Sequence, residues 1–212
     1  GDVFAQYTFW PEGDKLISWG PSISLQRIWD HEGAKLDDLV DAGMNFQFHR
    51  QTTASVSWVE KEEVLRPKDF AALLENRAFP QNTASIELAT SFFRELTLRL
   101  EASRGTTVHF TPPEGEAPTT ADADTLGLTL TLRPWNPLTI DNTFLSTNLS
   151  SPDDGEAIFT NHILRTKWNW QWNRELSFRF IAQYDEIDAN ETATSLRSGK
   201  NLNFDVLATY LV

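Results

Sequence analysis

The sequence predicts an all-β fold, an antiparallel up-and-down meander of about eleven strands that forms part of a transmembrane β-barrel. Three observations support this prediction. Apolar and polar residues alternate with a period of 2 along most of the 212 residues. Short and long connections alternate between the predicted strands, and aromatic residues gather beside the short ones. Residues 1–212 are predicted to form a single barrel domain, because no linker or helical crossover divides them.

The hairpin at residues 157–187 shows the alternation most clearly. Its arms meet at a turn near Asn173 and Arg174, and each continues for about ten residues, the length that a tilted strand needs to cross a bilayer. One face is mainly apolar or aromatic and the other is mainly polar. The apolar set is Leu164, Trp168, Trp170, Trp172, Leu176, Phe178, Phe180, Ala182 and Tyr184, and the polar set is Arg165, Lys167, Asn169, Gln171, Ser177, Arg179, Gln183 and Asp185.

The first half of the chain contains six predicted strands. Residues 3–10 alternate and end at the turn residues Pro11 to Asp14. Residues 15–29 form a second strand, which Pro21 is expected to bend or bulge. The remaining four alternate in the same way and occupy residues 40–49, 53–58, 84–92 and 96–102.

The second half contains five predicted strands. Residues 126–133 place a leucine at every second position and stop at the turn around Pro134 and Pro137. Residues 138–149 follow, and the central hairpin supplies the next two strands. Residues 202–210 form the last, in which apolar residues alternate with polar ones.

The connections alternate in length. The short ones lie at 11–14, 50–52, 93–95, 134–137 and 173–175, and the long ones at 30–36, 60–82, 103–122, 150–156 and 187–200. An up-and-down meander places all short turns at one end and all long loops at the other, as in outer-membrane barrels. Inside the second long connection, apolar residues at helical spacing behind Pro67 predict a short helix at residues 68–79.

Aromatic residues indicate which face meets a membrane. Trp168, Trp170 and Trp172 follow one another on one face, as in the aromatic girdle of a membrane barrel. Other aromatics lie within a few residues of short turns: Trp10, Phe48, Phe92, Phe93 and Trp135. We expect Leu98, Leu128, Leu130, Phe178, Phe180, Phe204 and Val206 to point outward to lipid, and Arg99, Arg165, Lys167, Arg179 and Asp205 to point into the lumen.

Composition excludes several other classes of protein. The formal net charge of -12 disfavours nucleic acid as a partner, because phosphate-binding surfaces need an excess of Lys and Arg. No run approaches the ~20 apolar residues of a membrane-spanning helix. The chain has no cysteine, which fits a compartment where free thiols are a liability.

The sequence predicts no catalytic, cofactor-binding or metal-binding residue. His31, His49, His109 and His162 are scattered without the spacing of a zinc site or a catalytic dyad. Acidic residues cluster in the predicted long loops, where oxygen-rich sites can bind Ca²⁺, but none has EF-hand spacing and solvated acidic loops are the commoner case. The clusters are Glu60, Glu62 and Glu63; Glu114 and Glu116; Asp122 and Asp124; Asp153, Asp154 and Glu156; and Asp185, Glu186 and Asp188.

The chain resembles one known family over residues 122–212 most clearly. The run NHILRTKWNWQWNRELSFRFIAQYDEI at 161–187, followed by LNFDVLATYLV at 202–212, is similar to the C-terminal barrel of a bacterial family of unknown function. Members of that family carry an N-terminal carbohydrate-binding-like domain of the family 9 type, which these residues lack. The resemblance implies a β-barrel in the outer membrane of a Gram-negative bacterium, with lipid as partner and a possible carbohydrate partner through the absent domain. Family members continue for further strands, so the barrel is expected to be incomplete at the C-terminus.

Two functions from different classes stay open. The first is an outer-membrane barrel that anchors an exported binding protein or passes a solute, without catalysis. The alternative is a β-barrel or sandwich in aqueous solution that binds an apolar ligand in its interior. The two differ in which face of the strands is exposed.

Overall fold

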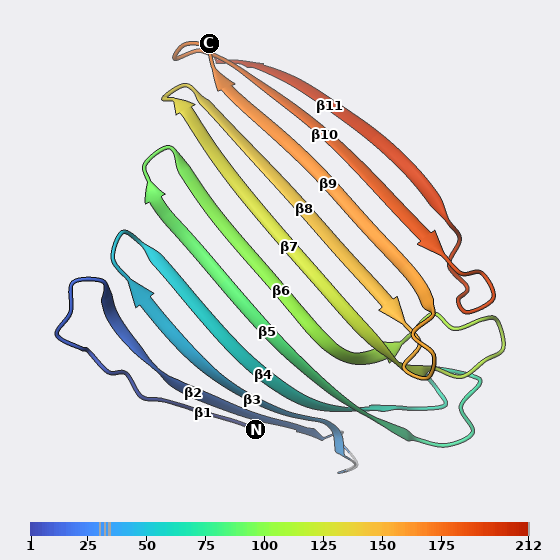
Figure 1. Cartoon of the computed structure of the whole chain (residues 1–212). Coiled ribbons are helices and arrows are strands. Elements are labelled where there is room, and N and C mark those ends of the chain that lie inside the picture. The colour runs from blue at the N-terminus through green and yellow to red at the C-terminus, as the bar shows by residue number, and fades with distance from the viewer. Residues whose placement is uncertain (30, 32, 34, 212) are drawn as a thin grey trace.

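The computed structural model describes residues 1–29, 31, 33 and 35–211, which form one antiparallel sheet (Figure 1). Within these residues the sheet has eleven strands whose spatial order is their order along the chain, which confirms the predicted up-and-down meander. The strands are β1 (Asp2–Gln6), β2 (Leu16–Trp29), β3 (Lys35–Phe48), β4 (Thr52–Leu65), β5 (Arg77–Phe93), β6 (Leu96–His109), β7 (Thr119–Trp135), β8 (Leu138–Ser150), β9 (Ala157–Gln171), β10 (Leu176–Ala189) and β11 (Gly199–Tyr210).

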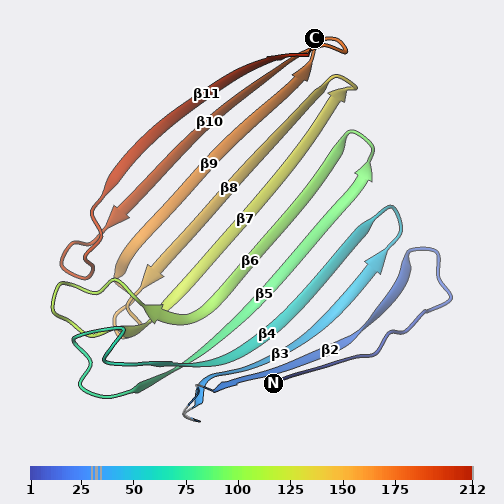
Figure 2. The ribbon, with the colours of Figure 1, turned by 180° about the vertical axis from the view of Figure 1, so that it is seen from behind.

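The sheet is curved and open. Figures 1 and 2 show β1 and β11 at opposite edges, with the short turns along one end and the long loops along the other. Ladders join each strand to its neighbours, and within the described residues none joins β1 to β11. The open sheet agrees with the predicted incomplete barrel.

The registers keep side chains of one kind on one face of the sheet. Phe180 lies opposite Trp168 on β9 and Val206 on β11, whereas its neighbour Arg179 lies opposite Asn169. Adjacent residues of a strand point to opposite faces. We call the face that carries Phe180 the apolar face and the face that carries Arg179 the polar face.

On β2 and β5 the apolar face is the more exposed of the two, as expected for the convex side of a curved sheet where side chains splay apart, whereas on β6 the long side chains Arg99 and Glu101 of the polar face are exposed. On β5 the exposed residues are Pro80, Asn82, Ala84 and Ile86 of the apolar face, and the half-buried residues are Gln81, Thr83, Ser85 and Glu87 of the polar face. The start of β2 follows the same rule, since Ser18 and Gly20 of the polar face are buried while Pro21 and Ile23 are exposed. The polar face is therefore concave.

The buried core lies at the long-loop end of the sheet. One cluster joins Leu65, Leu73, Phe79 and Val108, and a second joins Ala121, Leu149 and Ile158, with Ala193 packed against it. These clusters include residues of three long loops, 66–76, 110–118 and 190–198, which we call the loop cap. Ala193 contacts polar-face positions, so the loop at 190–198 folds over the concave side.

The predicted helix at residues 68–79 is wrong. The segment forms isolated turns, in which the amides of Asp69 and Phe70 donate to the carbonyl of Arg66, and β5 already begins at Arg77. A stretch this short nucleates a helix poorly. Its apolar residues pack in the loop cap instead. Leu73 is buried there, whereas Leu74 is 99% exposed.

Several connections also differ in length from the prediction. The connection predicted at 60–82 is only 66–76 in the structure, and the one predicted at 103–122 is only 110–118. Both are shorter because strands β4 to β7 continue past the apolar stretch that predicted them. The first connection is longer than the predicted turn at 11–14. Strand β1 ends at Gln6, and beyond it a single bridge between Phe9 and Trp19 pairs the chain with β2.

Gly105 marks the place where β6 leaves β5, and it yields a prediction. A Cβ there would lie 1.9 Å from the carbonyl oxygen of Asn82, whereas at Gly127 the nearest atom is the Leu145 side chain at 3.5 Å. We expect Gly105→Ala to lower the free energy of unfolding by ~1–3 kcal/mol through overpacking. Gly127→Ala is the control and should change it far less. Denaturant titration of both variants measures the difference, and equal effects would contradict the close approach.

Candidate lipid interface

The apolar face presents a band of apolar side chains, many of them exposed and those on β6 and β8 largely half-buried. All of the residues predicted to point outward lie on it, as the register pairs Leu98 with Leu130 and Phe180 with Val206 show. All of the residues predicted to point into the lumen lie on the opposite face, Arg99 facing Thr129 among them. Large members of the band are exposed on β2 to β5, β7 and β9 to β11: Ile23, Leu25, Val40, Val56, Trp58, Ile86, Leu126, Leu164, Trp168, Trp170, Phe178, Leu202, Phe204, Val206 and Tyr210.

Aromatic rings border the band at the short-turn end. The ring of Trp170 lies 4.9 Å from that of Trp172 and 6.0 Å from that of Phe178. Near the other edge of the sheet, Phe9 stacks on Trp19 at 4.6 Å. Indole and phenyl rings in this position suit the boundary between hydrocarbon and headgroups.

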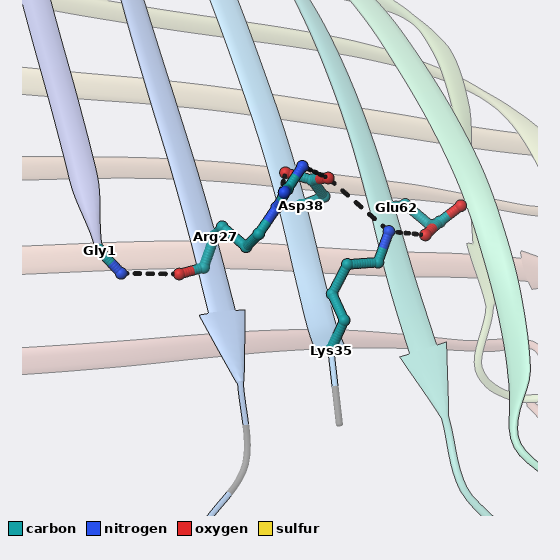
Figure 3. Close-up of polar contacts among 5 residues, drawn as sticks. All are labelled: Gly1, Arg27, Lys35, Asp38 and Glu62. Carbon is teal, nitrogen blue, oxygen red and sulfur yellow. Dashed lines mark hydrogen bonds and ion pairs between the residues drawn. The ribbon is translucent and has the colours of Figure 1, made fainter. Parts of the chain in front are cut away.

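Paired charges border the band at the long-loop end, on the same face. Arg27 binds both carboxylate oxygens of Asp38, at 2.6 and 3.2 Å, and Lys35 lies between Asp38 and Glu62 (Figure 3). Arg27, Asp38 and Glu62 are directly opposite one another on three successive strands. The α-ammonium group of Gly1 donates to the carbonyl oxygen of Arg27 beside this group, at 2.8 Å.

The long-loop half of the apolar face carries two further ion pairs, in other rows of the sheet. Arg104 of β6 lies 3.5 Å from Asp124 of β7, and Lys200 of β11 lies 2.7 Å from Glu186 of β10. The hydroxyl of Tyr184 also donates to Glu186. We call the whole set the ionic belt: Arg27, Lys35, Asp38, Glu62, Arg104, Asp124, Glu186 and Lys200.

The ionic belt was missed in the sequence. All members except Lys35 occupy positions in phase with the apolar residues of their strands, so each of them interrupts the apolar alternation with a charge on that face. That break is the signal that marks them. The predicted placement of several acidic residues in long loops is wrong, because β4, β7 and β10 extend farther than their apolar stretches. These strands include Glu60, Glu62, Glu63, Asp122, Asp124, Asp185, Glu186 and Asp188.

The band between the two borders is somewhat shorter than the apolar band of membrane barrels. On β6 the band runs from Leu96 to Arg104, and at ~3.4 Å per residue this distance is about 27 Å along the strand. Strands of membrane barrels tilt by about 35–45°, so the band would stand about 20 Å tall, close to the ~25 Å apolar band of such barrels.

The polar face carries charges in its middle layers. Arg99 lies 2.9 Å from Glu87 and also pairs with Glu101. Within the described residues, Arg165, Lys167 and Arg179 take part in no ion pair. The Nε atom of Arg179 is buried without a hydrogen-bond partner. The concave side therefore offers cations on β9 and β10 and a mixed cluster on β5 and β6.

The histidines and the remaining loop carboxylates do not converge. His109 contacts the carbonyl oxygen of Ala193 through Nε2, at 3.0 Å, and so helps to hold the loop cap. In the part of the chain that the structure describes, no three His, Cys, Asp or Glu side chains gather as metal ligands would. In the loop 151–156, the amide of Glu156 donates to Asp154 and lowers the pKa of that carboxyl, with a further contribution from Ser151.

No protein-family model matches the chain, and a comparison with curated proteins finds no match. Throughout residues 1–29, 31, 33 and 35–211, no helix is long and apolar enough to cross a membrane.

The two faces can be told apart with single cysteines, because the chain has none of its own. We expect a bimane label at Ile86→Cys, on the apolar face, to emit at shorter wavelength in lipid vesicles and to resist quenching by iodide. The same label at Glu87→Cys, on the polar face, should be quenched. Ala84→Cys is the control that shares the face of Ile86. Equal quenching at Ile86→Cys and Glu87→Cys would contradict the assignment of faces.

Proposed function

We propose that the chain forms the wall of a β-barrel in a bacterial outer membrane. In this proposal the barrel anchors an exported binding protein or passes a solute, and it performs no catalysis. The observation that supports it best is the exposed apolar band, which lies between aromatic rings at one end and the ionic belt at the other.

The exposure of this band is costly in water. Val206 is 74% exposed and Ile86 is 57% exposed, and each such side chain gains ~1.5–3 kcal/mol when fully removed from water. Monomeric proteins in solution rarely expose contiguous apolar patches beyond a few hundred Å². A lipid bilayer covers the band on every strand at once, without a specific partner for each strand.

The ends of the sheet support an orientation. Short periplasmic turns and longer external loops are typical of outer-membrane barrels. In this proposal the loop cap and the ionic belt lie toward the cell exterior, and the rings of Trp170 and Trp172 lie at the periplasmic boundary. Membership of the bacterial family with a carbohydrate-binding-like domain belongs to the same proposal, as does a carbohydrate partner for that domain.

The alternative, a barrel or sandwich in aqueous solution with an apolar ligand inside, needs the apolar side chains to line the interior. The exposure pattern on β2 and β5 favours the opposite arrangement. The concave side instead carries Arg99, Glu101 and Lys167, which suit water or a polar solute.

Detergent dependence of the complete protein tests the proposal. We expect the protein to stay monodisperse in a micelle-forming detergent and to precipitate when the detergent is removed. Added to lipid vesicles, it should become resistant to carbonate extraction. A protein that stays monodisperse without detergent and does not enter vesicles would contradict the proposal and support the alternative.

A pair of substitutions on β11 tests whether lipid or water contacts the band. Val206→Arg places a charge midway between Lys200 and Tyr210 on the apolar face. If lipid covers this position, the stability of the barrel in vesicles should fall by ~2–4 kcal/mol. Asn203→Arg, on the polar face of the same strand, should change it by about 0.5 kcal/mol or less.

Denaturant titration in vesicles measures both variants. On a surface in contact with water, an arginine at this highly exposed position would be tolerated. An unchanged stability of Val206→Arg would therefore count against a lipid interface.

A further inference from the structure

A row of hydroxyl groups crosses the polar face beneath the loop cap. Ser57 of β4, Ser85 of β5, Ser103 of β6, Thr125 of β7 and Thr147 of β8 lie directly opposite one another on successive strands. Ser57 and Ser85 are 2.7 Å apart, and Ser103 and Thr125 are 2.5 Å apart. We call these residues the hydroxyl row. It carries no charge, unlike the layers nearer the short turns.

The loop cap roofs the space above this row. The hydroxyl of Thr194 donates to the carbonyl of Thr111 at 2.6 Å, and the amide of Ser195 donates to the same oxygen at 3.0 Å. The ring of Phe110 stacks against Phe70 of the neighbouring loop at 6.2 Å. These contacts join loops that are distant in sequence. The space is therefore covered by several loops packed against one another.

The space between row and roof is a cavity of about 460 Å³. Its wall includes Ser103, Thr125 and Thr147 of the hydroxyl row, with Gln81, Phe110 and Phe159 around them. Among the described residues that line it, none is Asp, Glu, Lys or Arg. Its size falls within the ~300–1,000 Å³ of small-molecule pockets.

This lining matches one class of solute. Serine and threonine hydroxyls donate and accept hydrogen bonds, so a row of them suits a ligand that does the same. A charged ligand would lose its hydration on entering the cavity and would find no side chain of opposite charge in the wall. Binding of such a ligand is therefore unfavourable. The apolar faces of Phe110 and Phe159 suit the C–H surfaces of a ring.

We propose that the cavity binds a neutral solute that carries several hydroxyl groups, of the size of a small saccharide. The inference rests on the proposed function and deepens it, because it names the class of solute that meets the concave side of the barrel wall. Ser103, Thr125 and Thr147 of the hydroxyl row supply the hydrogen bonds, and the loop cap holds the solute at the long-loop end.

The test uses the complete protein in a detergent without a sugar headgroup, such as lauryldimethylamine oxide, and maltose as the probe. Isothermal titration should show saturable binding of maltose and at least roughly tenfold weaker binding of the anion maltobionate. Thr125→Val keeps the shape of the side chain and removes its hydroxyl. We expect it to weaken maltose binding about 3- to 10-fold, the effect of one lost hydrogen bond.

Thr129→Val is the matched control, because Thr129 lies on the same strand and face but outside the cavity. It should leave maltose binding unchanged within about twofold. Ser103→Ala is a second test variant, and heat-dependent migration on gels checks that each variant is folded. Absence of saturable maltose binding, equal binding of maltose and maltobionate, or equal effects of Thr125→Val and Thr129→Val would overturn the inference.

Insertion into vesicles is measured on the same samples. A protein that inserts but does not bind maltose overturns the inference and leaves the proposed function standing. A protein that binds maltose but needs no detergent overturns the proposed function, and with it the assignment of this cavity to a barrel lumen.

Discussion

The structure depends on backbone hydrogen bonding in register between neighbouring strands. Side chains alternate with a period of 2, so a slip of one residue in any ladder would move that strand's apolar side chains to the concave side. The ladders from β2 to β11 avoid such a slip along the band. Among the residues that the structure describes, irregular steps occur only near strand ends, as between Thr90 and Phe93. The band, the ionic belt and the hydroxyl row exist because ten ladders agree in register.

The strand count, the meander and the two faces could be predicted from the sequence, because each follows from local alternation and from turn residues. The ends of the strands could not be predicted in this way. Beyond the band the alternation of apolar residues stops, yet β5 starts at Arg77 and β6 runs to His109. Backbone hydrogen bonds to a neighbouring strand extend each of these strands beyond the residues whose apolar alternation predicts it.

The candidate site shows the same division. Positions such as Leu128 and Val206 follow from the period of their own strands. The ionic belt depends on which charge faces which across strands, as Arg104 faces Asp124, and this requires the register. The loop cap depends on contacts between loops far apart in sequence. Phe70 and Leu73 looked helical because their shared role is to pack against Phe79 and Val108.

The loop cap has a consequence for the order of folding. Every ladder joins strands that are neighbours in the chain, so the sheet can grow one hairpin at a time with short loop closures. The contact between Thr111 and Thr194 instead joins residues 83 positions apart, on either side of β7 to β10. Closing that long loop carries a larger entropy cost until the strands between are in place. We therefore expect the contact between the loops 110–118 and 190–198 to form late, after the β6–β10 wall is complete.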